Sequence, residues 1–367
     1  MQKNFTKGSV LKALMAFSMP YLLSCFLQTF YGMADLYVTG QYNKAAAISA
    51  VSIGSQVMHM LAVVVVGLAM GTTVLLGQAV GEKNQEKAGK IVGNTVVLFL
   101  AVSVVFTGLL LLGTDQIMEW VAVPKEALAQ TKSYLTICFC GIPFITAYNI
   151  LSCIFRGMGD SKSPMYFVAA ACVLNILLDF LFIGGFQMAA TGAALGTVLS
   201  QTASVIMAFA VIRKKKEFAL HLTGRDLRPE RETLGKILKI GVPVACQDGF
   251  IQISFILITV IANQRGVVAA AGVGIVEKVI SFLFLVPSAM LSSISAIAAQ
   301  NVGAGKHERA EKTLGYGLLI SVSFGIVAAL ACNLAPEMIL GLFSKEKDII
   351  FMGSQYLKAY ALDCAIA

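Results

Sequence analysis

The sequence has 367 residues, of which 57% are hydrophobic and only 13% are charged. Soluble globular proteins average roughly 25% charged residues, and the mean hydropathy here is +0.79. This composition excludes an ordinary soluble protein and predicts an integral membrane protein, with the lipid bilayer as its surroundings.

Uncharged stretches long enough to cross a bilayer recur along the chain, since ~20 apolar residues span ~30 Å of hydrocarbon. A β-barrel is not expected, because barrel strands alternate apolar and polar residues whereas these runs are continuous. Single spans are expected within residues 13–34, 45–81, 91–114 and 133–155, two within 163–212, and single spans within 239–265, up to about 295, within 313–336 and from 349 onward. The sequence therefore predicts an all-α polytopic membrane protein with about ten transmembrane helices.

Basic residues predict the orientation of these spans. The N-terminus and the loops on its side carry 20 of the 28 lysines and arginines, whereas the opposite loops carry six. Cytoplasmic loops are enriched in these residues. We therefore expect a cytoplasmic N-terminus in the plasma (cytoplasmic, or cell inner) membrane. The asymmetry also explains the net charge of +8, so no nucleic-acid partner is expected.

The chain contains an internal repeat. At an offset of 222 residues and without gaps, 78–88 matches 300–310 at Gln, Val, Gly, Glu and Ala, and Tyr134 falls opposite Tyr356. Six spans per copy bring both copies into the membrane from the same side, an arrangement typical of transporters that rock around a central site. We predict a six-helix N-terminal lobe (1–212), a basic cytoplasmic linker (213–236) and an incomplete, pseudo-symmetric C-terminal lobe with helices seven to ten (237–367).

Polar residues inside the expected spans need a reason, because a charge at the bilayer centre costs at least ~2.5 kcal/mol. The first span carries a stripe at helical spacing, formed by Ser24, Gln28, Tyr31 and Asp35. Asn175 and Asp179 are four residues apart, so they share one helix face. The alternatives are that Asp35 lies at the outer interface and that the Asn175–Asp179 pair merely joins helices.

Four short stretches resemble one transporter family. They are RGMGDSKSP (156–164), GQAVG (77–81), ADLYVTG (34–40) and NILLD (175–179). Together they resemble the multidrug and toxic compound extrusion (MATE) transporters over the whole chain. The resemblance implies twelve helices in two six-helix lobes and export of organic cations driven by sodium or proton entry. Because the sequence ends in its tenth expected helix, we expect either a fragment or a truncated protein.

The resemblance also implies a coupling-ion site in the N-terminal lobe. Its pattern of an aspartate in helix one, an asparagine and aspartate in helix five, a threonine in helix six and a tyrosine in helix four is matched by Asp35, Asn175, Asp179, Thr197 and Tyr134. Carboxylate, amide and hydroxyl oxygens suit a hard cation, so the first four are candidate Na⁺ ligands. A protonated carboxylate would serve proton coupling instead. Family members also bend helix one at a proline, which Pro20 matches.

Further candidates for substrate binding or for a site in the second lobe are Gln28, Tyr31, Asp248, Gln252, Glu277, Lys278 and Asp363. Some family members carry an acid in helix seven, which Asp248 resembles. The alternative is a salt bridge from Lys278 to Asp248, because neighbours such as Glu277 and Lys278 cannot face each other on a helix. No second-lobe acid falls opposite Asp35 or Asp179 at the repeat offset, so the scaffold is repeated and the polar chemistry is not.

We therefore expect a secondary active antiporter, monomeric and not an enzyme, that exports small cationic amphiphilic substrates by rocking alternating access. Its coupling ion is Na⁺ or H⁺, and no other cofactor is expected. A lipid-linked saccharide flippase of the same superfamily is the alternative. It would need several arginines in central spans for an anionic carrier, whereas no arginine falls inside an expected span. No Gly-Lys pair is followed by the Ser or Thr of a P-loop, so ATP drive is not expected.

Overall fold

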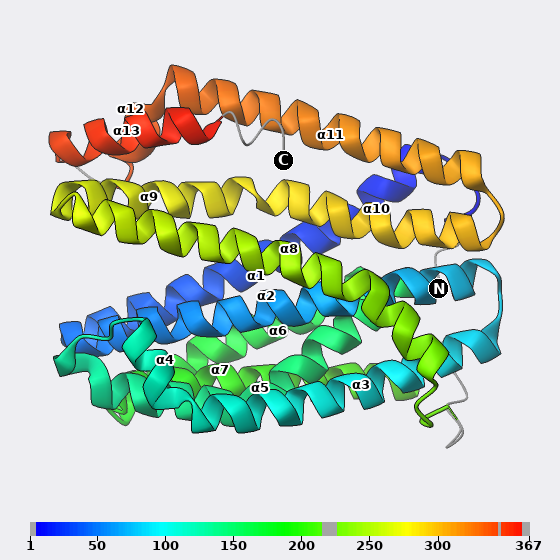
Figure 1. The fold of residues 1–367 in the computed structure, drawn as a ribbon, viewed down its shortest axis with the longest axis horizontal. Coiled ribbons are helices and arrows are strands. Elements are labelled where there is room, and N and C mark those ends of the chain that lie inside the picture. The colour runs from blue at the N-terminus through cyan, green and yellow to red at the C-terminus, as the bar shows by residue number, and fades with distance from the viewer. Residues whose placement is uncertain (1–4, 215–225, 344–345, 362–367) are drawn as a thin grey trace.

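The computed structural model describes residues 5–214, 226–343 and 346–361, and all regular structure in these residues is helical. The elements are α1 (Val10–Tyr42), α2 (Ala45–Gly81), α3 (Gln85–Leu112), α4 (Thr114–Trp120), η1 (Lys125–Ala127), α5 (Leu128–Gly157), α6 (Lys162–Asp179), η2 (Phe180–Gly185), α7 (Ala189–Lys214), α8 (Arg231–Gln264), α9 (Val267–Leu283), α10 (Leu285–Gly303), α11 (His307–Leu334), α12 (Pro336–Gly341) and α13 (Lys347–Ala361). The long helices run side by side along the longest axis of the molecule (Figure 1).

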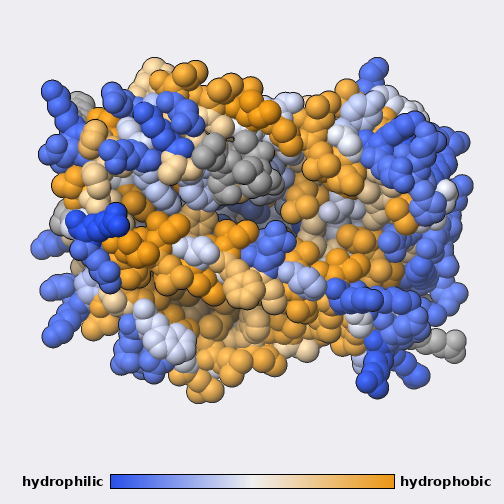
Figure 2. All heavy atoms as spheres, turned by 45° about the horizontal axis from the view of Figure 1, so that its top comes forward, coloured by the Kyte–Doolittle hydropathy of each residue, from blue (hydrophilic) through white to orange (hydrophobic). Residues whose placement is uncertain are grey.

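Nine helical segments of the described residues are long and apolar enough to cross a membrane. They correspond to the first nine spans expected from the sequence, with the turn within 163–212 falling between η2 and α7. The tenth expected span corresponds to α13, for which 15 residues are described. On the face shown in Figure 2, hydrophobic residues cover the middle of the molecule and hydrophilic residues gather at both ends of its long axis. The all-α, multi-pass membrane fold is therefore confirmed.

The internal repeat is present in the helix boundaries as well as in the sequence. Shifted by 222 residues, the bounds of α3 become those of α11, and α2 covers the positions of α9 and α10 together. In Figure 1, α2–α7 lie in the lower part of the view and α9–α13 in the upper part, so the two copies form two lobes, while α1 and α8 cross from one part to the other. The predicted linker 213–236 includes the last residues of α7 and the first turn of α8.

One difference between the copies has a local cause. Where α2 is continuous, its counterpart is interrupted at Phe284, between α9 and α10. Pro287 lies just beyond the break and replaces Val65 of the first copy. Proline lacks a backbone N–H and clashes with the carbonyl four residues earlier, which accounts for the break in the second copy alone.

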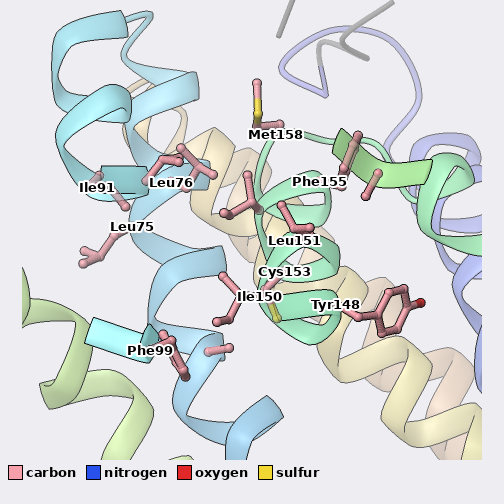
Figure 3. Close-up of a cluster of buried hydrophobic side chains, with 14 of the residues drawn as sticks. Leu75, Leu76, Ile91, Phe99, Tyr148, Ile150, Leu151, Cys153, Phe155 and Met158 are labelled. Carbon is pink, nitrogen blue, oxygen red and sulfur yellow. The ribbon is translucent and has the colours of Figure 1, made fainter. Parts of the chain in front are cut away.

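The first lobe has a dense apolar core near the end of the molecule that contains the N-terminus and the α2–α3 and α10–α11 connections, called here the basic end. Side chains from α2, α3 and α5 converge there, including Leu76, Phe99 and Phe155, each 1% exposed or less (Figure 3). This core fixes α5, which carries several polar residues described below.

The two lobes meet at the basic end through reciprocal glycine contacts. A Cβ on Gly81 of α2 would overlap the carbonyl oxygen of Gln300 of α10, and a Cβ on Gly303 would overlap that of Gln78. These four positions are equivalent at the repeat offset. The lobes therefore close on each other along a pseudo-twofold axis, with main chain against main chain.

Valine at both Gly81 and Gly303 is expected to separate the lobes at the basic end by a few ångströms, because each new side chain would overlap a backbone carbonyl. Spin labels at positions 90 and 312, in a cysteine-free background, measure this separation. Valine at Gly108, where an added Cβ would meet nothing within 4 Å, is the matched control. An unchanged distance in the double variant would show that these contacts do not hold the lobes together.

Candidate functional site

Asp35 lies inside the first lobe rather than at an interface with water or headgroups. It is 3% exposed, and its Oδ2 accepts a hydrogen bond from the Thr197 hydroxyl of α7 at 3.2 Å. The surrounding helices therefore shield the Asp35 carboxylate from water and lipid. The first and sixth spans supply one hydrogen-bonded pair in the lobe interior.

Asn175 and Asp179 complete this group from α6. They are 1% and 0% exposed, and both side chains lie beside the Asp35 carboxylate. Asp179 is the last residue of α6, and the chain continues as the π-helix η2. Such π-helical turns are often found at functional sites. The packing of α1, α6 and α7 thus brings together four residues that the sequence separates by up to 162 positions, the separation of Asp35 and Thr197.

These four residues, Asp35, Asn175, Asp179 and Thr197, are called here the acidic site. A glycine makes room for it: a Cβ added to Gly196 of α7 would lie 2.6 Å from Oδ1 of Asp179. Gly196 was not predicted from the sequence, although a glycine directly before Thr197 is a signal for close approach of another element.

Several buried polar atoms of the acidic site have no hydrogen bond of acceptable geometry with any described residue. They are Oδ1 of Asp35, both carboxylate oxygens of Asp179 and both amide atoms of Asn175. Buried polar atoms are normally paired, and two adjacent carboxylates disfavour each other's ionisation. The donor set therefore fits a small hard cation bound between the carboxylates, or a proton held on one of them.

Tyr134 lies next to the acidic site without forming part of its hydrogen bonding. It is 2% exposed, its ring packs against Gly54 of α2, and it is close enough to Asp35 and Tyr31 to interact with both electrostatically. Tyr31, one turn before Asp35, accepts a hydrogen bond from Nε2 of Gln201 at 3.1 Å. The outer half of the α1 stripe thus faces α5 and α7.

The inner half of the same stripe lies elsewhere. Gln28 lines a small cavity together with Tyr148 and Arg156 of α5. The apolar run of this span ends at residue 155, but α5 continues to Gly157, and Arg156 is buried, 5% exposed. Helix ends are poorly defined by hydropathy, because a helix continues past the last apolar residue when the lobe buries it.

The second-lobe candidates do not form one site in the described residues. The ion pair expected between Lys278 and Asp248 is not formed: Oδ2 of Asp248 lies near Gly67 of α2, whereas Lys278 lies near His59. The reason is that Asp248 faces the first lobe from α8, which packs along α2.

Glu277 has its own partner within the second lobe. Its Oε1 accepts a hydrogen bond from the Thr259 hydroxyl of α8 at 2.9 Å. Gln252 is half-buried, one turn beyond Asp248. Asp363 lies outside the described residues. The second lobe therefore has polar groups inside it, but no counterpart of the acidic site among its described residues.

Pro20 lies inside the continuous helix α1 and borders an open apolar groove between α1 and α9. The groove has a volume of about 650 Å³. Phe26 of α1 and Phe282 of α9 line it, with ring centroids 6.3 Å apart. Drug-sized ligands occupy pockets of roughly 300–1,000 Å³, so this space is large enough for a small organic molecule.

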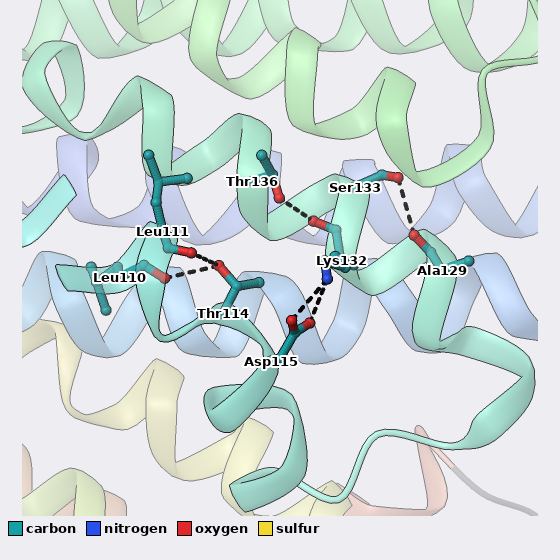
Figure 4. A network of polar contacts seen from close by, with 8 residues as sticks. All are labelled: Leu110, Leu111, Thr114, Asp115, Ala129, Lys132, Ser133 and Thr136. Atoms are coloured by element: carbon teal, nitrogen blue, oxygen red, sulfur yellow. Dashed lines mark hydrogen bonds and ion pairs between the residues drawn. The ribbon is translucent and has the colours of Figure 1, made fainter. Parts of the chain in front are cut away.

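An exposed ion pair lies at the end of the molecule that is opposite the basic end. It contrasts with the buried acidic site. Nζ of Lys132 donates to both oxygens of Asp115 at 2.6 and 2.9 Å (Figure 4). The two side chains are 53% and 71% exposed. Exposed pairs of this kind contribute only ~0–1 kcal/mol, which makes Asp115 a suitable control for the buried aspartates.

The two-lobed helical fold, with buried carboxylates inside one lobe, defines a multi-pass membrane transporter. The MatE family model matches residues 20–181 and 243–366. The chain is 30% identical over 355 residues to "Probable multidrug resistance protein YpnP" of Bacillus subtilis strain 168, covering 97% of this chain and 79% of that protein. The chain belongs to the MatE family, as the sequence motifs predicted.

Other comparisons agree. "Multidrug export protein MepA" of Staphylococcus aureus strain MSSA476 is 27% identical over 354 residues, covering 96% of this chain and 78% of that protein. A solved structure described as "Outward-facing conformation of a multidrug resistance MATE family transporter of the MOP superfamily" has a TM-score of 0.88 at 22% identity, covering 99% of this chain and 81% of that chain. A likeness at this identity shows the fold.

Alanine at Gly196 is expected to lower the melting temperature of the purified protein, because its Cβ would meet the Asp179 carboxylate and overpacking typically costs ~1–3 kcal/mol. A thiol-reactive dye that reports exposure of buried cysteines, such as Cys138 and Cys172, measures the transition. Adding Asp179→Ala removes the clashing oxygen, so the double variant should lose less than the two single losses combined. Alanine at Gly185, where the nearest atom is 3.9 Å away, is the control; equal effects at both glycines would contradict the close approach.

Proposed function

We propose that this protein exports organic cations from the cytoplasm in exchange for Na⁺ or H⁺, which enters through the acidic site. The observation that carries the proposal is the pair of buried carboxylates, Asp35 and Asp179, whose free oxygens point to a missing positive charge. Relatives named as multidrug resistance and multidrug export proteins support the export of drugs.

The energy for such an exchange depends on how many ions enter for each cation that leaves. A one-for-one exchange of monovalent cations moves no net charge, so a tenfold Na⁺ or H⁺ gradient, worth ~1.4 kcal/mol, supports about a tenfold gradient of the exported cation. Each further ion that enters carries a net charge and adds ~2.3 kcal/mol per 100 mV of membrane potential. The ion binds where it compensates two carboxylates that otherwise repel each other. Its arrival therefore changes the balance of charge between α1, α6 and α7, the helices that form the site.

Alternating access fits the contacts between the lobes. The reciprocal contacts of Gly81 and Gly303 close the basic end, which the lysine and arginine distribution assigns to the cytoplasm. Side chains also cross there, because Leu14 and Phe17 of α1 pack against Ile297 of α10, so opening this end requires α1 to part from α10. Pro20 removes one backbone hydrogen bond from α1, so this helix has a place to bend when the lobes move.

The open apolar groove between α1 and α9 suits the proposed substrates. Phe26 and Phe282 present aromatic rings from opposite lobes, and aromatic faces attract organic cations. A flippase is not favoured, because binding an anionic carrier would need several arginines near the centre of the molecule. Among the described residues, Arg156 is the one buried arginine.

Asparagine at Asp179 or at Asp35 is expected to reduce export of an ethidium-type cation by roughly tenfold or more, the factor for losing one charge-assisted interaction of ~1.5 kcal/mol or more. Export is measured in proteoliposomes, after equal incorporation of each variant is verified. Asp115→Asn, which removes an exposed carboxylate, should export normally. Normal export by both buried-site variants would refute coupling through the acidic site.

The same proteoliposomes distinguish the coupling ion. A Na⁺ gradient at equal pH on both sides drives export if Na⁺ is coupled, and a pH gradient without Na⁺ drives it if H⁺ is coupled. The ion that drives the wild-type protein should fail to drive Asp179→Asn. Export that neither gradient drives would refute the antiport.

Alanine at Phe282 is expected to weaken transport of flat aromatic cations by about twofold to thirtyfold, since a cation–π contact is worth ~0.5–2 kcal/mol. Transport of an aliphatic quaternary ammonium ion of similar size should fall less in Phe282→Ala, because this ion has no flat ring to stack on the phenyl ring. Phe209→Ala removes a phenylalanine of α7 that is 53% exposed and serves as the control. Equal losses in the two variants would place the substrate elsewhere.

A further inference from the structure

The small cavity beside Arg156 is built differently from the acidic site. It lies within the first lobe, between α1 and α5, toward the basic end. No aspartate or glutamate is among the described residues that line it. Arg156 therefore carries a buried positive charge that no carboxylate in the cavity wall neutralises.

The contacts of Arg156 leave part of the guanidinium without a partner. One Nη donates to the Cys153 sulfur at 2.8 Å, a weak acceptor. The guanidinium carbon lies 4.7 Å from the centre of the Tyr21 ring. Nε is buried and forms no hydrogen bond with any described residue. A buried charge is normally both paired and hydrogen-bonded, and here the pairing is missing.

Other side chains in the cavity wall also carry hydrogen-bond donors. The Ser152 hydroxyl is buried and has no hydrogen bond of acceptable geometry with a described residue. Tyr148 lies beside Ser152 and Gln28, so its hydroxyl and the Gln28 amide face the same space. By contrast, the Asn149 amide already donates to the carbonyl of Ile145. The cavity thus combines a positive charge with hydroxyl and amide donors.

We propose that this cavity binds a small monovalent anion, of which chloride is the simplest, held by Arg156 and Ser152. The cavity has about 30 Å³ of space, and one water needs roughly 10–15 Å³. That space fits a monatomic anion and is too small for a lipid headgroup or a phosphate ester. Water would satisfy the hydrogen bonds of Nε but would not balance the charge, so an anion fits the site better.

The test uses the purified protein at constant Na⁺, which keeps the acidic site unchanged. We expect chloride and bromide to raise the melting temperature above that in gluconate at equal ionic strength. Arg156→Gln should abolish the difference. Ser152→Ala, which preserves packing, should raise the half-maximal chloride concentration about tenfold, the effect of losing one hydrogen bond to a charged group. Crystals grown in bromide should show anomalous density beside Arg156.

Two matched controls accompany these variants. Arg228→Gln removes an exposed arginine and Ser133→Ala an exposed serine of α5, and both should keep the chloride response. If Arg156→Gln does not fold, Ser152→Ala and the bromide density decide the outcome. Equal melting temperatures in chloride and gluconate, an unchanged response in Ser152→Ala, or no bromide density in the cavity would each overturn the proposal and leave a cavity filled by water.

Discussion

The structure depends on one constraint: hydrocarbon offers no partner to a polar or charged group. Backbone groups meet this constraint within long helices, and side chains meet it by facing the interior of a lobe. The acidic site and the cavity at Arg156 both lie inside the first lobe, while large apolar side chains such as Leu100 and Ile206 are exposed at 61% and 64%. Polar groups in such a place persist because they bind something or hold helices together.

The repeat explains why the lobes meet as they do. Two copies of one helix pattern, related by a pseudo-twofold axis, bring equivalent positions together, so Gly81 faces Gln300 as Gly303 faces Gln78. This contact requires the same small residue in both copies. Buried residues inside one lobe, away from this contact, do not contact their equivalents in the other lobe. The two copies can therefore differ at these positions. Asp35 and Glu277 could thus arise on different helices and have different partners, Thr197 and Thr259.

Continuous apolar runs predicted the membrane helices well, because crossing hydrocarbon requires a minimum length of apolar chain. Helical spacing predicted which residues share a face, as for Asn175 and Asp179, and family motifs grouped them with Asp35 and Thr197. Spacing says nothing of how one helix is rotated against another. The expected pairing of Lys278 with Asp248 therefore failed, and the close approach of Gly196 to Asp179 was not foreseen.

The opposite charges within the first lobe are too far apart to neutralise each other. Tyr21, which touches Arg156, and Asp35 are separated along α1 by roughly 20 Å at 1.5 Å per residue. At that distance, with an effective dielectric constant of about 20, two unit charges attract by only ~0.8 kcal/mol. Burial of either charge costs several times more. Each charge consequently needs a partner within its own contact distance: a cation or proton among the aspartates, and an anion beside the arginine.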